Sequence, residues 1–361
     1  MSRESRSVGR PPDRQTAVSS QLRDQIVHGV LAPGAQLPAR TRLRESFQVS
    51  HMTVQRALDQ LRREGFVYTT PRGTFVATDP PHLCRYAMSF PVQPVPGEPW
   101  SRFWTALHQA ALSLQEPDTR QFGFYFGIND KTNSADFHRL MADARVHRFA
   151  GIVFASPPFA LADTDILAQP DMPRVGVMAS PFLGVPAVYP DFQSFYRRAL
   201  AYLATRGRRR IANLSVAVDP DCVEQMMSLV RSLGMTSRPQ WQQGCTLENT
   251  YAAGQIAHLL FAARGDEVPD ALIISDDNLV EHACGGLIAA GVRVPQDLDV
   301  IAHCNYPCPA PNVLPVRRLG FDCARIMRQC IEIIDTGRRG GHVPERTLIP
   351  AQFEEELGRS E

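Results

Sequence analysis

The sequence contains almost no lysine: Lys131 is the only one among 361 residues, so arginine supplies nearly all of the 38 basic side chains. A pyridoxal-phosphate enzyme needs a lysine that forms a Schiff base with its cofactor. Lys131 lies in a polar stretch that resembles a loop. We therefore exclude a domain with that chemistry.

Long apolar runs are also absent. No segment approaches the roughly 20 apolar residues that a membrane-spanning helix needs. The first six residues, Met-Ser-Arg-Glu-Ser-Arg, lack the apolar core of a signal peptide. These absences predict a cytoplasmic protein with no membrane partner.

The eight cysteines form no Cys-x-x-Cys pair and no small secreted framework, which favours reduced thiols. His303, Cys304 and Cys308 leave open a metal site or an oxidation sensor. Buried, inert cysteines are the simpler interpretation, and we expect no metal. The chain also has no Gly-x-Gly-x-x-Gly after a strand, no P-loop, no Gly-x-Ser-x-Gly and no His-Glu-x-x-His. We expect neither an enzyme nor a cofactor.

Charge is divided unevenly along the chain. Residues 1–78 contain twelve arginines against six acids, a net charge of +6. Since the whole chain carries +1, the remaining residues carry −5. A basic head on a mildly acidic body suits a protein that neutralises DNA phosphates with one domain.

Residues 50–65 have the pattern of a short helix that presents one polar face. Ser50 is a good N-cap and Gly65 a good stop signal. Apolar residues recur at helical spacing and predict a buried stripe: Val54, Ala57, Leu58 and Leu61. The polar first turn has the size and chemistry to enter a DNA major groove, although an ordinary surface helix is the alternative.

The neighbouring segments favour the DNA-binding interpretation. Short helices are predicted upstream, and two β-rich runs joined by a basic turn are predicted downstream: 16–28, 40–47, 66–69 and 74–77. Helix, turn, helix, recognition helix and hairpin together describe a winged helix-turn-helix.

Residues 16–77 resemble the DNA-binding domain of GntR-type bacterial regulators. The matching positions are Gly29, Pro33-Gly34, Leu37-Pro38, Val49-Ser50, Thr53-Val54, Ala57-Leu58, Leu61, Glu64-Gly65 and Gly73-Thr74-Phe75-Val76. The chain departs from the family at Ala39-Arg40-Thr41, where a helix cap is lost, and at His51 and Gln55, where arginines are usual. Arg reads guanine and Gln reads adenine, so a different base preference is expected. The predicted DNA contacts are Arg40, Thr41, Arg42, Ser50, His51, Thr53, Gln55, Arg56, Arg72 and Gly73.

From Cys84 onward, apolar strand patterns alternate with helical patterns, which predicts doubly wound parallel sheets. Expected strands are 85–90, 121–127, 151–156, 174–178, 210–216, 271–275 and 298–303. Expected helices are 103–114, 193–206, 223–233, 249–263, a helix ending at 290, and 321–335. About 275 residues suit two lobes.

This body resembles the effector-binding domain of LacI/GalR-type repressors, whose fold is that of a periplasmic sugar-binding protein. The resemblance is clear from about residue 188 and rests on three segments: 199–212, 269–277 and 291–301. The combination of a GntR-type head with this body is similar in architecture to arabinose-type repressors. It implies an α/β protein: a winged helix-turn-helix plus a two-lobed domain of doubly wound parallel sheets.

In open α/β sheets, ligands bind beyond the carboxyl ends of the strands. The predicted effector contacts are therefore Trp100, Phe103, Trp104, Ser156, Tyr189, Asp191, Asp277 and Asn305. The aromatic residues are suited to stack on a sugar and the carboxylates to accept its hydroxyl protons. The alternatives are that some aromatics serve the core and that Asp276 or Asp277 caps a helix. Sugar binders of this type commonly have Arg near Cys222 and Asp near Cys304, so a conventional monosaccharide is in doubt.

These observations divide the chain into a disordered tail (1–14), a winged helix-turn-helix domain (15–78), a stiff extended linker (79–84) and an effector-binding and dimerisation domain (85–361). The predicted function is a bacterial transcription regulator, most simply a repressor. It would bind a palindromic operator as a homodimer and respond to a small polar, carbohydrate-like effector. The alternative is a solute-binding protein without affinity for DNA.

Overall fold

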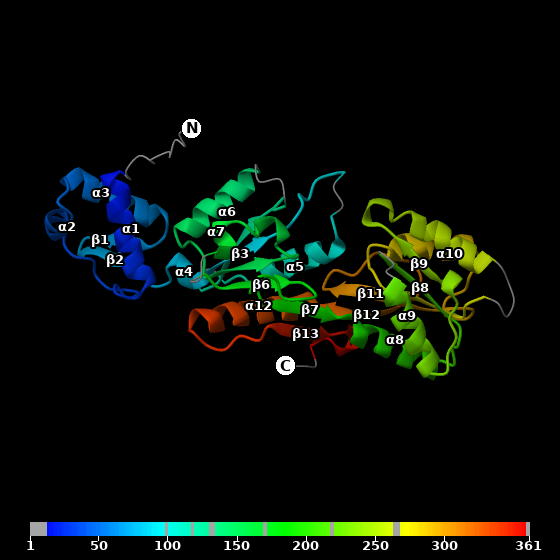
Figure 1. Ribbon diagram of the computed structural model, residues 1–361. Coiled ribbons are helices and arrows are strands. Elements are labelled where there is room, and N and C mark those ends of the chain that lie inside the picture. The colour runs from blue at the N-terminus through cyan, green and yellow to red at the C-terminus, as the bar shows by residue number, and fades with distance from the viewer. Residues whose placement is uncertain are drawn as a thin grey trace, which may run out of the picture.

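The computed structural model describes residues 13–97, 100–116, 119–129, 134–168, 172–216, 220–262 and 268–358. Three bodies follow one another along the molecule: a small N-terminal head, a middle lobe (the N-lobe) and a distal lobe (the C-lobe) (Figure 1). Most of the predicted tail lies outside the described residues. The first helix begins at Arg14, two residues earlier than expected.

The head is a three-helix bundle with a β-hairpin: α1 (Arg14–Val27), α2 (Arg40–Phe47), α3 (His51–Arg63), β1 (Val67–Thr70) and β2 (Gly73–Val76). The two strands are antiparallel. Its core contains the predicted stripe of α3 together with Leu22, Ile26 and Phe66, all of them buried. The predicted winged helix-turn-helix is confirmed, and it has a hydrophobic core of its own.

The segment that joins the head to the body differs from the extended linker predicted for residues 79–84. Pro80 is extended, but Pro81–Cys84 forms the short helix α4 instead of continuing the predicted extended linker. Proline is well suited to the first position of a helix, because its fixed φ is helical and the N–H that it lacks would be unpaired there. The His82 ring stacks on Phe66 of the head, with ring centroids 5.9 Å apart. The joint is therefore a packed turn.

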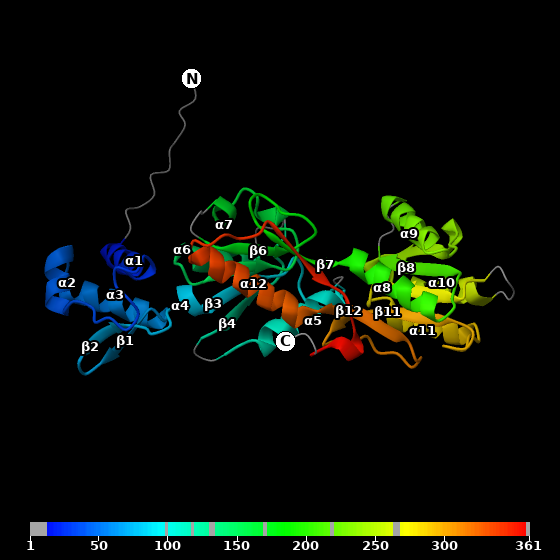
Figure 2. The ribbon, with the colours of Figure 1, turned by 90° about the horizontal axis from the view of Figure 1, so that it is seen from below.

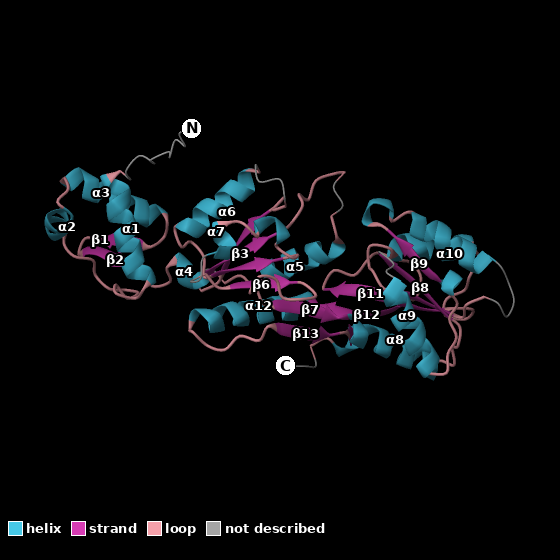
Figure 3. Cartoon of the chain, viewed as in Figure 1, coloured by secondary structure: helices cyan, strands magenta, loops and turns pink. Residues whose placement is uncertain are grey.

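The N-lobe contains a six-stranded parallel sheet in the order β13-β7-β6-β5-β3-β4. Its strands are β3 (Arg85–Ser89), β4 (Gln121–Tyr125), β5 (Gly151–Phe154), β6 (Arg174–Val177), β7 (Ala187–Asp191) and β13 (Arg346–Pro350). Its helices are α5 (Arg102–Ser113), α6 (Ala135–Arg145), the short α7 (Asp165–Ala168) and α12 (Cys323–Arg338). Helices lie on both sides of the sheet, as doubly wound sheets require (Figure 3).

The C-lobe has a second six-stranded sheet in the order β14-β12-β11-β10-β8-β9. Its strands are β8 (Ile211–Val216), β9 (Gln242–Cys245), β10 (Ala271–Ile274), β11 (Asp299–Tyr306), β12 (Arg317–Asp322) and β14 (Gln352–Phe353). The pairing of β12 with β14, at one edge of this sheet, is antiparallel, and the other pairings are parallel. The flanking helices are α8 (Phe192–Thr205), α9 (Pro220–Ser232), α10 (Ala252–Ala262) and α11 (Val280–Ala289). The expected two-lobed α/β architecture is confirmed.

The chain passes between the lobes at three places: from β7 to α8, from β12 to α12, and from β13 to β14. Two of these crossings carry a carboxylate that caps the next helix, Asp191 for α8 and Asp322 for α12. Helix α12 then spans the N-lobe from the side of the C-lobe to the side of α4 (Figure 2). One helix therefore connects the inter-lobe crossing to the head joint. Every helix in the described parts of the chain is too short or too polar to span a bilayer.

Candidate DNA-binding face and inter-lobe cleft

A stripe of buried side chains attaches helix α3 to the core of the head. The first turn of the helix is exposed and has an N-cap. Val54, Ala57 and Leu61 are completely buried. The Ser50 Oγ accepts a hydrogen bond from the Thr53 backbone N–H at 3.1 Å. Ser50, which is predicted to touch DNA, therefore also caps the helix, and Thr53, likewise predicted, supplies the N–H that is capped. His51, Met52 and Arg56 are exposed on the side away from the core.

Gln55 is half-buried, and its side chain is already engaged. Its Nε2 donates to Asp59 Oδ2 at 3.1 Å, and Asp59 pairs with Arg62 at 3.2 Å. For Gln55 to donate to a base, this hydrogen bond has to be exchanged for one to DNA. Such an exchange costs little, because one hydrogen bond replaces another.

The other predicted contacts lie at the start of α2 and at the wing tip. Arg40, Thr41 and Arg42 are exposed, and Ala39 provides no side-chain cap, in agreement with the loss expected from the sequence. Arg72 is exposed at the tip. Gly73 has a different role, because its φ is +141° and a Cβ there would lie 2.6 Å from the Gln36 Nε2. That Nε2 donates to the Arg72 carbonyl at 3.0 Å, so Gly73 shapes the wing.

Not every arginine of the basic head is available to DNA. Arg23 is buried, and its guanidinium pairs with Glu64 at 2.6 Å while lying over the Phe66 ring. This pair connects α1 to the end of α3. Part of the positive charge counted in the sequence thus stabilises the head.

Side chains from both lobes meet where the N-lobe contacts the C-lobe, the place at which the sequence predicts the effector cleft. Asp277, which follows β10, is 1 % exposed and lies beside Arg102 at the start of α5, with 4.0 Å between Oδ2 and Nε. The Asp277 Oδ1 is 3.9 Å from the His303 Nδ1 on β11. The Arg102 backbone N–H also donates to Asn278 Oδ1 at 2.9 Å, and its Nη2 donates to the Pro309 carbonyl at 3.2 Å. Arg102 of the N-lobe is therefore held against the C-lobe.

Burial dominates the titration of this cluster. It raises the pKa of Asp277 to about 7, an effect to which Asp276 adds and which hydrogen bonds from Asn305 and the charge of Arg102 oppose. Burial likewise lowers the pKa of His303 to about 3. Near neutral pH the imidazole is uncharged, and the Asp277 carboxyl is divided between its two forms.

Several polar atoms of this cluster have no hydrogen-bond partner among the described residues. They are Asp277 Oδ2, Arg102 Nε, Asn305 Oδ1 and both ring nitrogens of His303. Buried polar atoms in native proteins are almost always paired. Unpaired buried donors and acceptors near a contact between two lobes therefore mark a place where a polar ligand can complete the hydrogen bonding.

The predicted aromatic contacts pack against one another and against the core of the N-lobe. The Trp100 and Trp104 ring centroids are 5.5 Å apart, and Trp100 also packs on Phe90 at 5.3 Å. Their indole N–H groups donate to Thr105 Oγ1 at 2.8 Å and to the Ala155 carbonyl at 3.2 Å. Phe103 is half-buried against the main core. The structure thus supports the alternative that these rings serve packing, although both indoles stay partly exposed.

The remaining predicted residues lie at strand ends. Ser156 is half-buried just after β5, and Tyr189 is half-buried on β7, 6.1 Å from the Phe192 ring. The Asp191 Oδ1 accepts from the Ser194 N–H at 3.1 Å, so this carboxylate caps α8 at a lobe crossing. The helix-cap alternative raised for Asp276 or Asp277 is wrong, because α11 has Leu279 at its N-cap and no side-chain cap. The Asp276 Oδ1 instead accepts from the Asn278 N–H at 2.9 Å, in the turn before that helix.

Two central residues of the cleft were not among the predicted effector contacts, Arg102 and His303. The signal for Arg102 was its place in the loop after the first strand, next to Phe103. His303 had drawn attention only as a metal or redox candidate. Among the described residues, no group of three or more His, Cys, Asp or Glu side chains is arranged to hold a metal ion. Burial raises the pKa of Cys304 to about 12, which keeps that thiol protonated and unreactive.

Comparison with known proteins finds one family match in the head and another in the body. Residues 14–76 match the family of bacterial regulatory proteins of the gntR type, and residues 200–354 match the periplasmic-binding-protein-like domain. The arabinose metabolism transcriptional repressor of Halalkalibacterium halodurans is 21 % identical over 339 residues, which cover 87 % of this chain and 88 % of that protein. The repressor NagR of Bacillus subtilis is 43 % identical over 61 residues, which cover 17 % of this chain and 25 % of that protein.

Solved structures resemble the body. A LacI family regulator from Lactobacillus casei with bound glucose has a TM-score of 0.52 at 17 % identity and covers 75 % of this chain and 97 % of that chain. A regulatory protein of the LacI family from Chloroflexus aggregans has a TM-score of 0.57 at 18 % identity, with coverage of 74 % and 96 %. At such identity the likeness establishes the two-lobed fold.

Proposed function

Because this chain joins a GntR-type winged helix-turn-helix domain to a periplasmic-binding-protein-like domain, we propose that it is a transcriptional repressor whose affinity for DNA is set by a small polar effector. The observation that carries the proposal is the first turn of α3. That turn is capped by Ser50, exposed at His51 and fixed to the head by a buried stripe. A helix presented in this way is built to enter the major groove.

The head reads the operator with two kinds of contact. His51 and Gln55 face the base edges, whereas Arg40, Arg42 and Arg72 bind phosphates on either side. One head offers few contacts, so the protein acts in the cytoplasm as a homodimer on a two-fold symmetric operator. The arabinose and NagR repressors that resemble this chain support a role in repression.

The effector binds in the inter-lobe cleft, between Arg102 of the N-lobe and Asp277, His303 and Asn305 of the C-lobe. An uncharged imidazole and a carboxyl that titrates near pH 7 suit hydroxyl groups, which both donate and accept hydrogen bonds. A carbohydrate or a related polyol has this chemistry. The glucose-bound structure with the same fold supports that class of ligand.

The response reaches the head through α12. This helix begins at the inter-lobe crossing, capped by Asp322, and ends at Arg338 beside α4. An effector that binds one lobe arrangement better than the other shifts the position of α12 and with it the head. The coupling free energy expected between effector binding and DNA binding is on the order of 1–3 kcal/mol.

The test combines DNA binding with effector release. We expect the full-length protein to shift a DNA fragment containing the promoter of its own gene in a gel assay, and a screen of sugars and polyols to identify one that changes this affinity. Asp277→Ala should retain operator binding and lose the response, because the residue lies in the body. A protein that binds sugar without any affinity for that promoter would instead be a solute-binding protein. Loss of DNA binding with retained effector affinity in Asp277→Ala would refute the placement of the cleft.

A further inference from the structure

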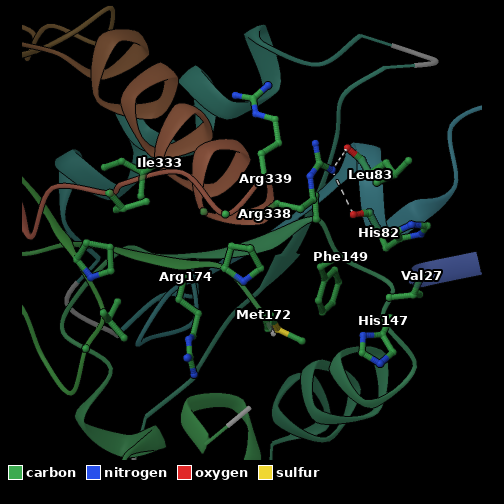
Figure 4. Close-up of a pocket in the computed structure, with 18 of the residues that line it drawn as sticks. Val27, His82, Leu83, His147, Phe149, Met172, Arg174, Ile333, Arg338 and Arg339 are labelled. Carbon is green, nitrogen blue, oxygen red and sulfur yellow. Dashed lines mark hydrogen bonds between the residues drawn. The ribbon is translucent and has the colours of Figure 1, made fainter. Parts of the chain in front are cut away.

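The first turn of helix α3 lies at the end of the head that is remote from the body. The chain that follows α3 enters the joint, where the Phe66 ring stacks on His82 at 5.9 Å and Arg338 donates to the His82 carbonyl oxygen (Figure 4). Over its 13 residues the helix rises about 20 Å. Helix α2, which leads directly into the first turn of α3, lies farthest from the body in Figures 1 and 2. The first turn is therefore open to a large partner.

Met52 lies at the centre of the exposed face of this turn. Successive residues of an α-helix turn by about 100°, so the buried Val54 and Leu61 lie about 200° and 180° around the axis from Met52. The Met52 side chain is 58 % exposed, and among the described residues of the head only Val30 is a large apolar residue with greater exposure. If this face enters a groove, Met52 lies closest to the groove floor.

The polar side chains next to Met52 are already hydrogen-bonded within α3 and its cap. The Ser50 Oγ and the Thr53 Oγ1 lie 2.9 Å apart and hydrogen-bond to each other. The Gln55 Nε2 donates to Asp59 Oδ2 at 3.1 Å. Gln55 follows Met52 by three residues and lies on the same side of the helix. The centre of the exposed face is thus an apolar surface bordered by polar groups that have partners.

The major groove of DNA offers one apolar group to such a surface, the C5-methyl group of thymine. A cytosine in the same place presents its N4 amino group, which would lose a hydrogen bond to water against a thioether. An A·T pair displays the adenine edge that glutamine can bind and the thymine methyl group side by side in the same groove. Met52 and Gln55 can therefore read one A·T pair or two neighbouring pairs.

We propose that Met52 is a specificity-determining residue that recognises the C5-methyl group of a thymine in each operator half-site. The inference rests on the proposed repressor function, and it adds to His51 and Gln55 a contact outside the set predicted from the sequence. The methionine side chain is flexible, so it can pack on a methyl group without a fixed direction of approach. Removal of that methyl group from water is the source of the preference.

The experiment removes the methyl group from DNA without changing the base pairing. The full-length protein selects its best-binding duplex from a random library, and each thymine of one half-site is then replaced singly by deoxyuridine. Fluorescence anisotropy measures the affinity for each duplex. We expect one thymine position at which the wild type binds the deoxyuridine duplex about threefold more weakly, the size expected for one methyl group partly removed from water. This thymine should lie within or next to the base pair whose preference changes in Gln55→Ala.

Met52→Gln tests whether the methionine is responsible. Glutamine has a similar length and helix propensity, and the site is exposed, so the head should fold normally. This variant should bind the thymine and deoxyuridine duplexes within about 1.5-fold of each other. Met52→Leu keeps an apolar side chain and should retain the difference of about threefold.

Val30→Gln is the matched control, because it also replaces an exposed apolar residue of the head. Val30 lies in the turn after α1, three residues beyond Val27, which lines the groove between the head and the N-lobe. This variant should retain both the affinity of the wild type and the thymine preference.

The ratio of thymine to deoxyuridine affinity is taken within each variant, so a general loss of affinity cannot imitate the expected result. Equal binding of the thymine duplex and every deoxyuridine duplex by the wild type would overturn the assignment of Met52. So would an undiminished difference in Met52→Gln. If the selection enriched no sequence at all, the proposed repressor function would fail, and this inference would fail with it.

Discussion

The Arg338 Nη1 donates a hydrogen bond of 2.6 Å to the Leu83 carbonyl oxygen, and this contact ties the last turn of α12 to the helix that carries the head. A second bond from the same nitrogen reaches the His82 carbonyl at 3.3 Å. Nearby, the Tyr86 Oη donates to Asp335 Oδ1 at 2.7 Å. Helix α12 starts at a lobe crossing, so these bonds make its far end the point where lobe movement meets the head.

We expect Arg338→Gln to uncouple the two functions. The variant should bind the operator within about twofold of the wild type, since Arg338 lies outside the recognition surface, and should lose most of the effector response. A glutamine is too short to hold both carbonyl oxygens. The measurement is operator affinity with and without effector. Glu332→Ala, an exposed change on the same helix, is the control and should respond normally. A full response in Arg338→Gln would exclude α12 as the connection.

Substitutions in the head should distinguish the residues that read bases from the residues that bind phosphates. Gln55→Ala should change which base is preferred, because the glutamine amide can bond adenine. Arg72→Ala should instead weaken binding to every sequence and reduce the slope of log affinity against log salt by about one. Fluorescence anisotropy with a set of single-base operator variants at several salt concentrations measures both effects. Equal weakening of all operators by Gln55→Ala would contradict its role.

The pKa of Asp277 gives a pH-dependent stability prediction. Burial raises it to about 7, so between pH 4 and pH 7 the native state holds a proton that the unfolded state has released. Stability contributed by this group therefore falls as pH rises through that window and levels off above it. An asparagine at this position has no proton to lose and would avoid this cost. Urea unfolding of Asp277→Asn should show a stability advantage over wild type that grows by about 2–3 kcal/mol from pH 5 to pH 8. A constant difference would mean that the carboxyl titrates normally.

Local patterns predicted the elements that carry strong local signals. Helix α2 was expected at residues 40–47 and is found there, because its boundaries follow from turn residues next to it. Strand β7 was missed, because Pro190 interrupts the pattern and the paired strand β13 comes about 160 residues later in the chain. Strand β9, Gln-Gln-Gly-Cys, has almost no apolar character of its own.

The candidate sites show the same limit. The candidate DNA contacts all lie between Arg40 and Gly73, so the sequence could predict them as a group. In the candidate effector site, Arg102 and Asp277 are 175 positions apart, and only the packing of one lobe against the other brings them together. Helix α4 was mistaken for an extended linker, because the contacts of His82 and Arg338 that hold it come from tertiary packing.

The last prediction concerns the contact between the lobes. The Arg102 side chain of the N-lobe reaches Pro309 and Asp277 of the C-lobe, so it stabilises this arrangement of the lobes, and its buried Nε has no hydrogen-bond partner among the described residues. Arg102→Ala should weaken effector binding at least about tenfold, which corresponds to the loss of one or two charge-assisted hydrogen bonds. Affinity for the operator without effector should change far less. Isothermal titration with the effector and gel shifts without it test both statements. Arg120→Ala, which removes an arginine paired with Glu116 in the same lobe, is the matched control. If Arg102→Ala bound the effector normally, the ligand would have to lie outside the cluster around Asp277.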